Sequence, residues 1–449
     1  MTSTADPRPP RRPAVRSRPP AALAAAALLL AALPARAQDS AAAPPPPPPA
    51  DASAAAVFQR LAPAVVRIEV QESGSRAKSG VGSGFFVSTD GLLVTNYHVV
   101  SRLVHRPASH AARATAAGGS WTLTLLAVDV VHDLAVLRAS GPAPSLAIAV
   151  APRELAKGTR VLALGHPRDL GLSIVEGTYN GRLEHTATAR LHYTGPINPG
   201  MSGGPAVTDD GALVGVNVAT MGEEVAFLVP ADAVAALLAR VPAAPPDRAG
   251  FLAGMTADLA ALAERTMAGL FTPGGPSVAL DGYRVPTAPD SSFRCWGDSD
   301  GDEDEAPGVR VAVHGCSMDE SIFLSETLGA GLARFEHELV RGQGLGRLRL
   351  LAALEGAFEQ ALPFDGTARE VTRFHCRHAN LRTAAHTWRS ALCVRRLRDF
   401  PGLYEGVFRS VSLGVYDAGL ITSLTLSGVP FDLIRTLTAR FLEAVGSTR

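Results

Sequence analysis

Three residues of the types that together perform nucleophilic catalysis occur in the order His98, Asp133 and Ser202. A serine hydroxyl is a poor nucleophile until a base removes its proton, and the base needs a carboxylate that fixes its tautomer and stabilises the imidazolium. Ser202 would attack a carbonyl carbon, His98 would act as general base and Asp133 would orient it. Because the order alone is a weak signal, the local setting of each residue has to be considered.

The serine lies in the most specific setting of the three. Small residues surround it in the segment Gly200–Pro205, which reads Gly-Met-Ser-Gly-Gly-Pro. A chain that turns sharply here can direct the amide N–H groups of Gly200 and Ser202 at one point, where they would stabilise an oxyanion. The alternative is a surface turn rich in glycine and proline that contains an incidental serine.

The histidine and the aspartate both adjoin apolar segments. His98 stands inside the apolar stretch from Leu93 to Val100, where a lone histidine is more often a packed core residue. Asp133 precedes the apolar segment Leu134–Leu137, where a carboxylate is desolvated unless it is paired, and a histidine ring N–H would supply the pair. The alternative for Asp133 is a turn-forming residue at a strand edge.

The region that must position these residues is rich in short strand-like segments. From Val57 to about Val241, apolar or alternating segments are divided by Gly, Pro, Asn and Asp, which predicts an all-β barrel or sandwich closed by a helix at Ala231–Val241. The expected strands are Ala64–Val70, Gly84–Val87, Leu92–Val94, Trp121–Val128, Arg160–Leu164, Ser173–Thr178, Ala189–Tyr193, Ala212–Val218 and Val225–Val229.

The pattern changes after the proline cluster at Pro242–Pro246, which predicts a domain boundary. Beyond it, helical and strand-like segments interleave, so we expect an α+β domain. The expected helices are Ala249–Leu270, Asp319–Val340, Leu348–Leu362 and Val429–Val445, and the expected strands are Gly308–Val313, Glu370–His375 and Val411–Tyr416.

Composition narrows the class of protein. A length of 449 residues predicts two domains and a leader, and the equal totals of 42 basic and 42 acidic residues exclude the strongly basic footprint of a nucleic-acid binder. A basic start, the apolar segment Ala21–Leu33 and the sequence Ala35-Arg36-Ala37 predict an export signal cleaved after Ala37. The apolar segment is shorter than the roughly 20 residues of a membrane-spanning helix, so a cleaved signal would leave no integral membrane protein.

Three sequence blocks together resemble one family. The segments Thr95–Val100, Asp133–Leu137 and Ile197–Pro205 resemble the HtrA/Deg branch of trypsin-like serine proteases, and Gly84–Val87 and Ala226–Pro230 are also similar to that branch. The resemblance extends over about residues 57–241 and is specific because the three blocks match in order and spacing.

The resemblance implies an all-β double barrel of the chymotrypsin kind, with the triad in the cleft between two six-stranded barrels. It assigns His98 as general base, Asp133 as its partner, Ser202 as nucleophile and the amides of Gly200 and Ser202 as oxyanion donors. It implies hydrolysis of peptide bonds in protein or peptide substrates through an acyl-enzyme, without a metal or organic cofactor. An exported enzyme of this kind, monomeric or oligomeric, would process or degrade proteins in the periplasm or cell envelope.

This sequence departs from the family pattern at three places. Met201 stands where the family usually has Asn, but its side chain is not a required donor. The position of the acidic pocket base of trypsin is near Pro196, with Ile197 next, so we expect a shallow apolar pocket formed by Ile197 and Val218 that accepts Val or Ala. No peptide-binding PDZ domain is recognisable in residues 247–449.

The expected organisation is a signal peptide at residues 1–37, a Pro/Ala-rich linker at 38–56, a protease domain at 57–241, a linker at 242–248 and an α+β domain at 249–449. Two other functions are considered. The barrels could be an inactive binding scaffold, although the intact triad residues argue against it, or the protein could be an envelope adaptor that acts through its C-terminal domain.

All four cysteines lie in the second domain, and an even number in an exported protein favours disulfides. Of the three possible pairings we prefer Cys295 with Cys316 and Cys376 with Cys393, closing hairpins that turn at Glu305-Ala306 and Ala384-Ala385. A zinc site formed by the second pair with His375 and His378 is disfavoured, because in a strand the two histidines would point to opposite faces. The alternating aspartates Asp298, Asp300, Asp302 and Asp304 lack the Gly and Glu positions of a helix-flanked calcium loop, so we expect a solvated hairpin tip.

Overall fold

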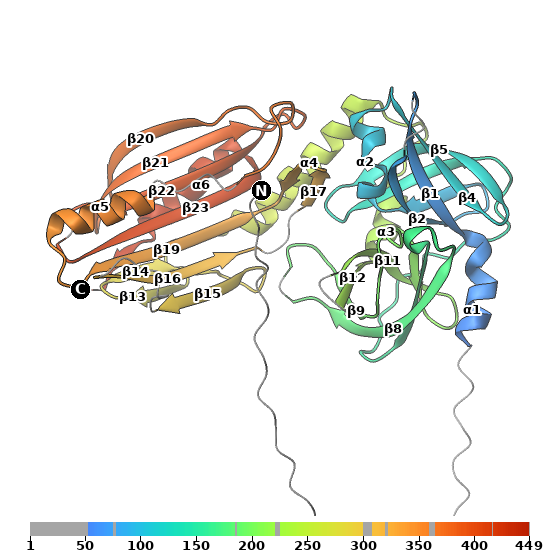
Figure 1. Ribbon diagram of the computed structural model, residues 1–449, viewed down its shortest axis with the longest axis horizontal. Coiled ribbons are helices and arrows are strands. Elements are labelled where there is room, and N and C mark those ends of the chain that lie inside the picture. Colours follow the sequence, from blue (N-terminus) through green and yellow to red (C-terminus); the bar gives the residue numbers. More distant parts are fainter. Residues whose placement is uncertain are drawn as a thin grey trace, which may run out of the picture. The chain divides into compact units, whose positions relative to one another are not determined.

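The computed structural model describes residues 53–74, 78–184, 186–220, 225–299, 308–318, 322–358, 364–414 and 416–448. The expected signal peptide lies outside the described residues, as do Glu305-Ala306 and the aspartates at 300, 302 and 304. From Ala50 onward the chain is one compact unit. Figure 1 shows two barrels in blue to green, followed along the chain by a seven-stranded sheet in yellow to red.

The first barrel is closed and antiparallel, with strand order β1-β2-β3-β6-β5-β4. A capped helix, α1 (Ala54–Leu61), and a short 3-10 turn, η1 (Ala62–Ala64), precede it, and helix α2 (Tyr97–His105) follows β3. The strands are β1 (Val65–Glu72), β2 (Lys78–Phe86), β3 (Leu92–Thr95), β4 (His110–Ala116), β5 (Gly119–Asp129) and β6 (Leu134–Ser140).

The second barrel repeats this design with strand order β10-β11-β12-β9-β8-β7. The 3-10 turn η2 (Pro167–Asp169) follows β7, and helix α3 (Ala231–Leu238) follows β12. The strands are β7 (Arg160–Gly165), β8 (Ser173–Arg182), β9 (Leu191–Thr194), β10 (Pro205–Val207), β11 (Leu213–Thr220) and β12 (Val225–Pro230). The expected double barrel is confirmed.

Apolar residues fill each barrel and also join the two. Along β6, Leu134 and Val136 belong to a buried cluster that includes Leu162 and Val216 of the second barrel. Their neighbour Leu137 points the other way, into the core of the first barrel. This alternation follows from the period of two in a strand. Because one face of β6 packs on the second barrel, the two barrels lie against each other, and their junction brings loops of both together.

The second domain begins with the long helix α4 (Arg248–Met267), whose N-cap Asp247 accepts from Gly250 N at 2.8 Å. Its main sheet has the order β15-β16-β19-β23-β22-β21-β20, and two small sheets accompany it, β13-β14-β24 and β17-β18. The strands are β13 (Ser277–Leu280), β14 (Tyr283–Pro286), β15 (Arg294–Ser299), β16 (Val309–Ser317), β17 (Ile322–Ser325), β18 (Leu328–Ala330), β19 (Ala333–Gly342), β20 (His375–Arg382), β21 (Thr387–Arg396), β22 (Leu403–Ser412), β23 (Ala418–Pro430) and β24 (Gly446–Ser447).

Helices cover both faces of the main sheet. On β23, Leu420 and Leu424 pack in a cluster with helix α6 (Phe431–Glu443) and the end of α4. The intervening Ile421 packs instead with helix α5 (Arg347–Phe358). Because neighbouring residues of a strand face opposite sides, α5 and α6 lie on opposite faces, and the α+β class is as expected.

One expected helix of the second domain is wrong. The segment Asp319–Val340 contains β17, β18 and most of β19 among its described residues. Along β19, buried residues alternate with more exposed ones from Ala333 to Leu339, which is the period of a strand. Gly329 and Gly331 interrupt any helical repeat, because glycine is unfavourable in helix interiors. The apolar residues of this segment partly fit both the strand period of two and the helical period of 3.6, and the structure follows the strand period.

Two expected strands are also displaced. In Glu370–His375 only His375 belongs to a strand, and Val371 forms an isolated bridge with Leu397. In Val411–Tyr416 the strand β22 ends at Ser412. Long-range pairing, which local sequence does not encode, decides where these strands begin and end.

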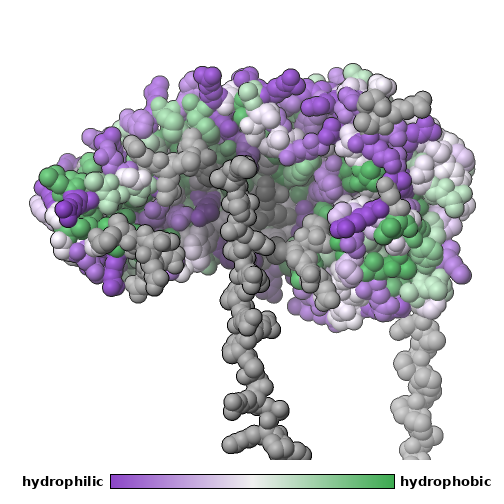
Figure 2. Space-filling model, viewed as in Figure 1, coloured by the Kyte–Doolittle hydropathy of each residue, from purple (hydrophilic) through white to green (hydrophobic). Residues whose placement is uncertain are grey.

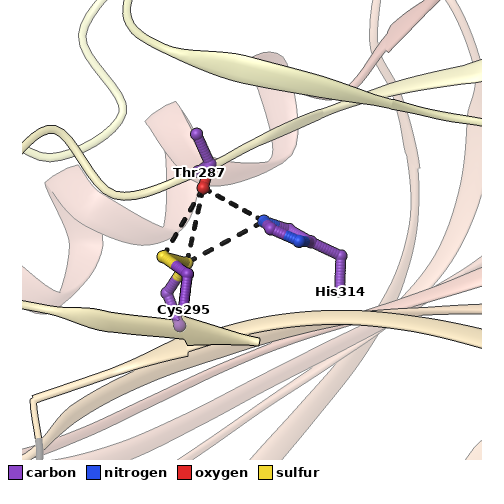
Figure 3. Close-up of a disulfide and its surroundings, with 4 residues drawn as sticks. Thr287, Cys295 and His314 are labelled. Atoms are coloured by element: carbon purple, nitrogen blue, oxygen red, sulfur yellow. Dashed lines mark hydrogen bonds between the residues drawn. A yellow bond between two sulfur atoms is a disulfide. The ribbon is translucent and has the colours of Figure 1, made fainter. Parts of the chain in front are cut away.

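The two disulfides join Cys295 to Cys316 and Cys376 to Cys393, which are the pairings expected from the sequence. Each bond links directly opposed residues of adjacent strands, and the second hairpin turns at Thr383–His386. Around the first disulfide, Figure 3 shows Thr287 and His314 directed toward the sulfur atoms.

On the face shown in Figure 2, hydrophilic and hydrophobic residues are interspersed, so this view marks no single apolar or polar binding surface. Within the part of the chain that the structure describes, no helix is both long enough and apolar enough to cross a membrane.

Candidate active site

Helix α2 carries His98 in its first turn. Asn96 is the N-cap, and Tyr97, Val100 and Val104 recur at helical spacing and are buried. The apolar stripe packs in the core of the first barrel and fixes the helix there. His98 lies beside that stripe, and 31% of its side chain is exposed. This burial pattern fixes the helix while leaving part of the His98 ring exposed to solvent.

Asp133 lies opposite the start of α2 in a left-handed conformation with φ 60°. Its carboxylate accepts from His98 N at 2.8 Å through Oδ1 and lies 2.6 Å from His98 Nδ1 through Oδ2. Its carbonyl accepts from Tyr97 N at 3.1 Å and from Asn96 Nδ2 at 2.8 Å. Asp133 therefore orients the imidazole and also supplies the N-terminus of α2 with negative charge, which the helix dipole favours.

The electrostatics of His98 follow from this geometry. Burial lowers the pKa of the imidazole, but the negative charge and hydrogen bond of Asp133 outweigh burial and leave the pKa above its usual value. The contact of Nδ1 with Asp133 leaves Nε2 as the ring nitrogen able to accept a proton. The arrangement can therefore act as a base through Nε2.

The loop that carries Ser202 turns with Gly200 at φ 98° and Gly203 at φ 85°, which only glycine adopts readily. Within the loop, Met201 N donates to Asn198 O at 3.0 Å and Gly203 N to Asn217 O at 2.9 Å. Among the described residues, the amide groups of Gly200 and Ser202 donate to no acceptor. The amides of Gly200 and Ser202, which are two positions apart, are therefore free to bind an anionic oxygen.

Ser83, a fully buried residue of β2, ties the first barrel to the Ser202 loop. Its Oγ donates to Gly200 O at 2.7 Å and accepts from His166 N at 2.8 Å. Its amide donates to Ser202 O at 2.8 Å, and its carbonyl accepts from Thr95 Oγ1 at 2.6 Å. The hydroxyl and the amide of this one residue thus hold the carbonyl groups of Gly200 and of Ser202 itself.

The Ser202 loop packs closely on β2, on the end of β3 and on Asn96, the N-cap of α2. A Cβ at Gly203 would lie 2.2 Å from both Ser83 O and Thr95 Oγ1, and a Cβ at Gly82 would lie 2.6 Å from Val99 Cγ2 and 3.1 Å from Ser202 O. Glycine is favoured at both positions, because a side chain at Gly203 would clash with β2 and β3, and one at Gly82 would clash with Val99 of α2.

The structure does not join the serine to the histidine by a hydrogen bond. Ser202 Oγ donates instead to Val218 O at 3.3 Å, and no bond to the His98 ring exists among the described residues. Catalytic hydrogen bonds are often long or misaligned without substrate, so this geometry is compatible with a base that engages the hydroxyl when substrate binds.

The expected pocket residues differ in exposure. Ile197 is buried, whereas Val218 is half-buried and its carbonyl accepts from Ser202 Oγ. Met201 is fully buried in the core of the second barrel, so its side chain serves packing. Of the two expected pocket residues, Val218 therefore adjoins Ser202 through its backbone carbonyl.

Sequence reasoning missed Ser83 as a functional residue. Its signal is the sequence Gly82-Ser83-Gly84, because two glycines around a polar residue inside a strand mark a close approach of another backbone. It also missed helix α2, although Tyr97, Val100 and Val104 have helical spacing. The short length of this helix and the strand before it concealed the pattern.

The zinc alternative in the second domain has no chemical basis. The sulfur atoms of Cys376 and Cys393 are bonded to each other, which removes the thiolates that zinc would need. Of the alternating aspartates, only Asp298 lies within the described residues.

Comparison with known proteins shows similarity in the region that carries this site. Residues 82–216 match the family model described as "Trypsin-like peptidase domain". Serine protease HTRA2, mitochondrial, from Bos taurus is 33% identical over 203 residues, covering 41% of this chain and 42% of that protein. Serine protease HTRA1 from Xenopus laevis is 32% identical over 200 residues, with the same two coverages. The matched part is therefore less than half the length of these curated relatives.

Among solved structures, the crystal structure of Deg5 is similar at 28% sequence identity and a TM-score of 0.36, covering 40% of this chain and 89% of that chain. The residues matched by the family model, 82–216, include Asp133 and Ser202, and the match begins in β2, the strand that carries Ser83. Two antiparallel barrels carry these residues. Residues 82–216 thus form a trypsin-like peptidase domain that is similar in sequence to those of HtrA serine proteases.

Proposed function

We propose that the protein is a serine endopeptidase in which Ser202 is the nucleophile, His98 the general base and Asp133 the orienting carboxylate. The observation that carries the proposal is the bidentate contact of Asp133 with the amide and ring of His98, in a helix whose N-cap, Asn96, lies close to Gly203 of the Ser202 loop. Kinship with serine proteases supports the same reaction.

In the proposed reaction, Ser202 Oγ attacks the carbonyl carbon of the scissile peptide while His98 Nε2 takes the hydroxyl proton. The carbonyl oxygen becomes an oxyanion and accepts hydrogen bonds from the amides of Gly200 and Ser202. His98 then gives its proton to the leaving amine, and the C–N bond breaks to leave an acyl-enzyme. Water, deprotonated by His98, hydrolyses the ester and restores Ser202.

We further propose that the residue before the scissile bond is small and apolar. Val218 is half-buried beside Ser202, and Ile197 provides no charge that could pair with Lys or Arg. The two disulfides are compatible with an oxidising compartment, so we propose export to the periplasm or cell envelope, where proteins and peptides would be the substrates.

The alternative of an inactive scaffold is less well supported, because a binding scaffold needs neither free amides at Gly200 and Ser202 nor an oriented histidine. An adaptor that acts through the second domain makes no use of this geometry either.

The test uses the full-length protein, unfolded casein and a fluorophosphonate probe that esterifies activated serines. The wild type should cleave casein and bind the probe, and Ser202→Ala should do neither. Ser73→Ala, which changes an exposed serine, is the matched control and should behave as wild type. A wild-type protein that neither cleaves nor binds the probe over a range of pH would refute the proposed activity.

A further inference from the structure

We propose that Phe323, on the β17–β18 hairpin of the second domain, is a positioning residue for His98. The inference rests on the proposed function, because it concerns the base of the same reaction. The hairpin is separated from the catalytic helix by more than two hundred residues of sequence, yet packs directly on α2.

One backbone carbonyl of the hairpin contacts both ends of α2. Tyr97 Oη donates to Leu324 O at 2.9 Å, and His105 Nε2 lies 2.9 Å from each of these two oxygens. Tyr97 is fully buried, and burial, followed by the charges of Asp133 and Asp399, raises the pKa of its hydroxyl. Tyr97 therefore remains a donor at any working pH, and the hairpin fixes the residue that precedes His98.

The ring of Phe323 contacts the catalytic histidine itself. Its centroid lies 6.1 Å from that of His98 at an interplanar angle of 73°, and 6.1 Å from that of Tyr97 at 64°. Both are edge-to-face arrangements, which aromatic rings prefer. His98 is thus oriented from two directions, by the Asp133 carboxylate at Nδ1 and by the Phe323 ring.

Apolar packing makes this contact part of a continuous core. Ile322, Leu324 and Leu328 of the hairpin belong to the same buried cluster as Val100 and Val104 of α2. An exposed ion pair between Arg102 and Glu326 adds a smaller contribution, since surface pairs contribute little to stability. The hairpin is therefore held against the helix by the hydrophobic effect rather than by charge.

Glu370 holds the turn of the hairpin in the second domain. Its carboxylate accepts from the hydroxyls of Ser325 and Thr327, the latter at 2.7 Å, and from the amide and hydroxyl of Thr367 at 2.9 and 2.7 Å. Burial raises the pKa of Glu370, but these hydrogen bonds outweigh it and lower the pKa to about 2. A series of direct contacts therefore leads from the second domain through the hairpin to His98.

The experiment measures kcat, KM and their pH dependence for full-length Phe323→Ala. We expect kcat to fall about tenfold with KM nearly unchanged, because a base displaced by a fraction of an ångström loses efficiency in the transition state. Removing the ring also exposes the imidazole to water. Because burial lowers the pKa of His98, the acid limb of the kcat profile should move to higher pH.

Two variants control for a merely structural effect. Phe323→Tyr retains the ring and should restore both kcat and the acid limb. Phe431→Ala removes an exposed phenylalanine of α6 in the same domain and should leave both at wild-type values. If Phe323→Ala does not fold, Glu370→Gln decides, since it loosens the turn without removing the ring and should shift kcat and the acid limb in the same direction by a smaller amount.

The outcomes separate this inference from the proposed function. If the wild type cleaves casein while Phe323→Ala and Glu370→Gln keep its kcat and acid limb, the positioning role is refuted and the protease activity stands. If the wild type itself neither cleaves casein nor binds the fluorophosphonate probe, the activity is refuted, and the positioning role with it.

Discussion

The serine side and the histidine side of the candidate site are held in different ways. The Ser202 loop is fixed by backbone turns and by Ser83, all within the two barrels. The helix that carries His98 is fixed on one side by Asp133 and on the other by a hairpin of the second domain. Within the described part of the chain, the contacts that hold the nucleophile come from the barrels, whereas the base is also held by a segment outside the matched residues 82–216.

This difference suggests how the second domain can influence the reaction. A displacement of the hairpin would change the orientation of His98 without moving the oxyanion amides of Gly200 and Ser202. Variants on the serine side should therefore affect transition-state binding at any pH, while variants on the histidine side should also change the pH profile.

Among the residues that support Ser202, the largest loss of kcat is expected for Asp133→Asn. The amide cannot stabilise an imidazolium and favours the wrong tautomer of His98, so kcat should fall by about 10⁴. Asp129→Asn is a matched control, because Asp129, a few residues earlier, pairs with His132 at 2.9 Å and with Arg240 at 3.2 Å, and among the described residues it has no hydrogen bond or ion pair with His98. Steady-state cleavage of casein measures both. Equal losses in the two variants would contradict the assignment of Asp133.

A smaller loss is expected for Ser83→Ala on the serine side. The change removes the hydroxyl that donates to Gly200 O and leaves a buried carbonyl without that donor. We expect kcat to fall by about 10², similar to the loss of one oxyanion donor, with the acid limb of the profile unchanged. Ser79→Ala, on the same strand but bonded to Val70 O, should retain wild-type kcat. A shifted acid limb in Ser83→Ala would show that the two sides are not independent.

The smallest expected effect is a shift of the acid limb in the pH profile of the wild type. His98 must be neutral to act as base, and its pKa is raised, so the imidazole retains its proton to higher pH than an ordinary histidine. The acid limb of kcat/KM should therefore lie above about 6.5, the usual value for histidine. Asp133 is the charged group that raises it, so residual activity of Asp133→Asn should show a limb at lower pH. A wild-type limb below the usual value would contradict the description of His98.

The sequence was informative where chemistry imposes local rules. The glycines around Ser202 predict a tight turn, and the turn exists, because positive φ angles leave few other residues possible. Most strands of the barrels follow from short apolar or alternating segments, but β4 and β10 are not predicted by the sequence pattern. The cysteine pairing follows from hairpin geometry and an even count.

The sequence was uninformative where distant segments meet. Nothing local to Phe323 indicates that its ring lies against His98, and the segment around it has a pattern compatible with a helix. The hydrogen bonds of Ser83 also join residues more than eighty positions apart. Such contacts depend on how the barrels and sheet pack, which one sequence does not specify.

The most direct test of the central claim is to treat the full-length protein with a fluorophosphonate probe and to locate the adduct by mass spectrometry. We expect a single adduct on Ser202 in the wild type and a strongly reduced yield of it in Asp133→Asn. An adduct on another serine, or none at a pH where His98 is neutral, would contradict the assignment of Ser202 as the activated nucleophile.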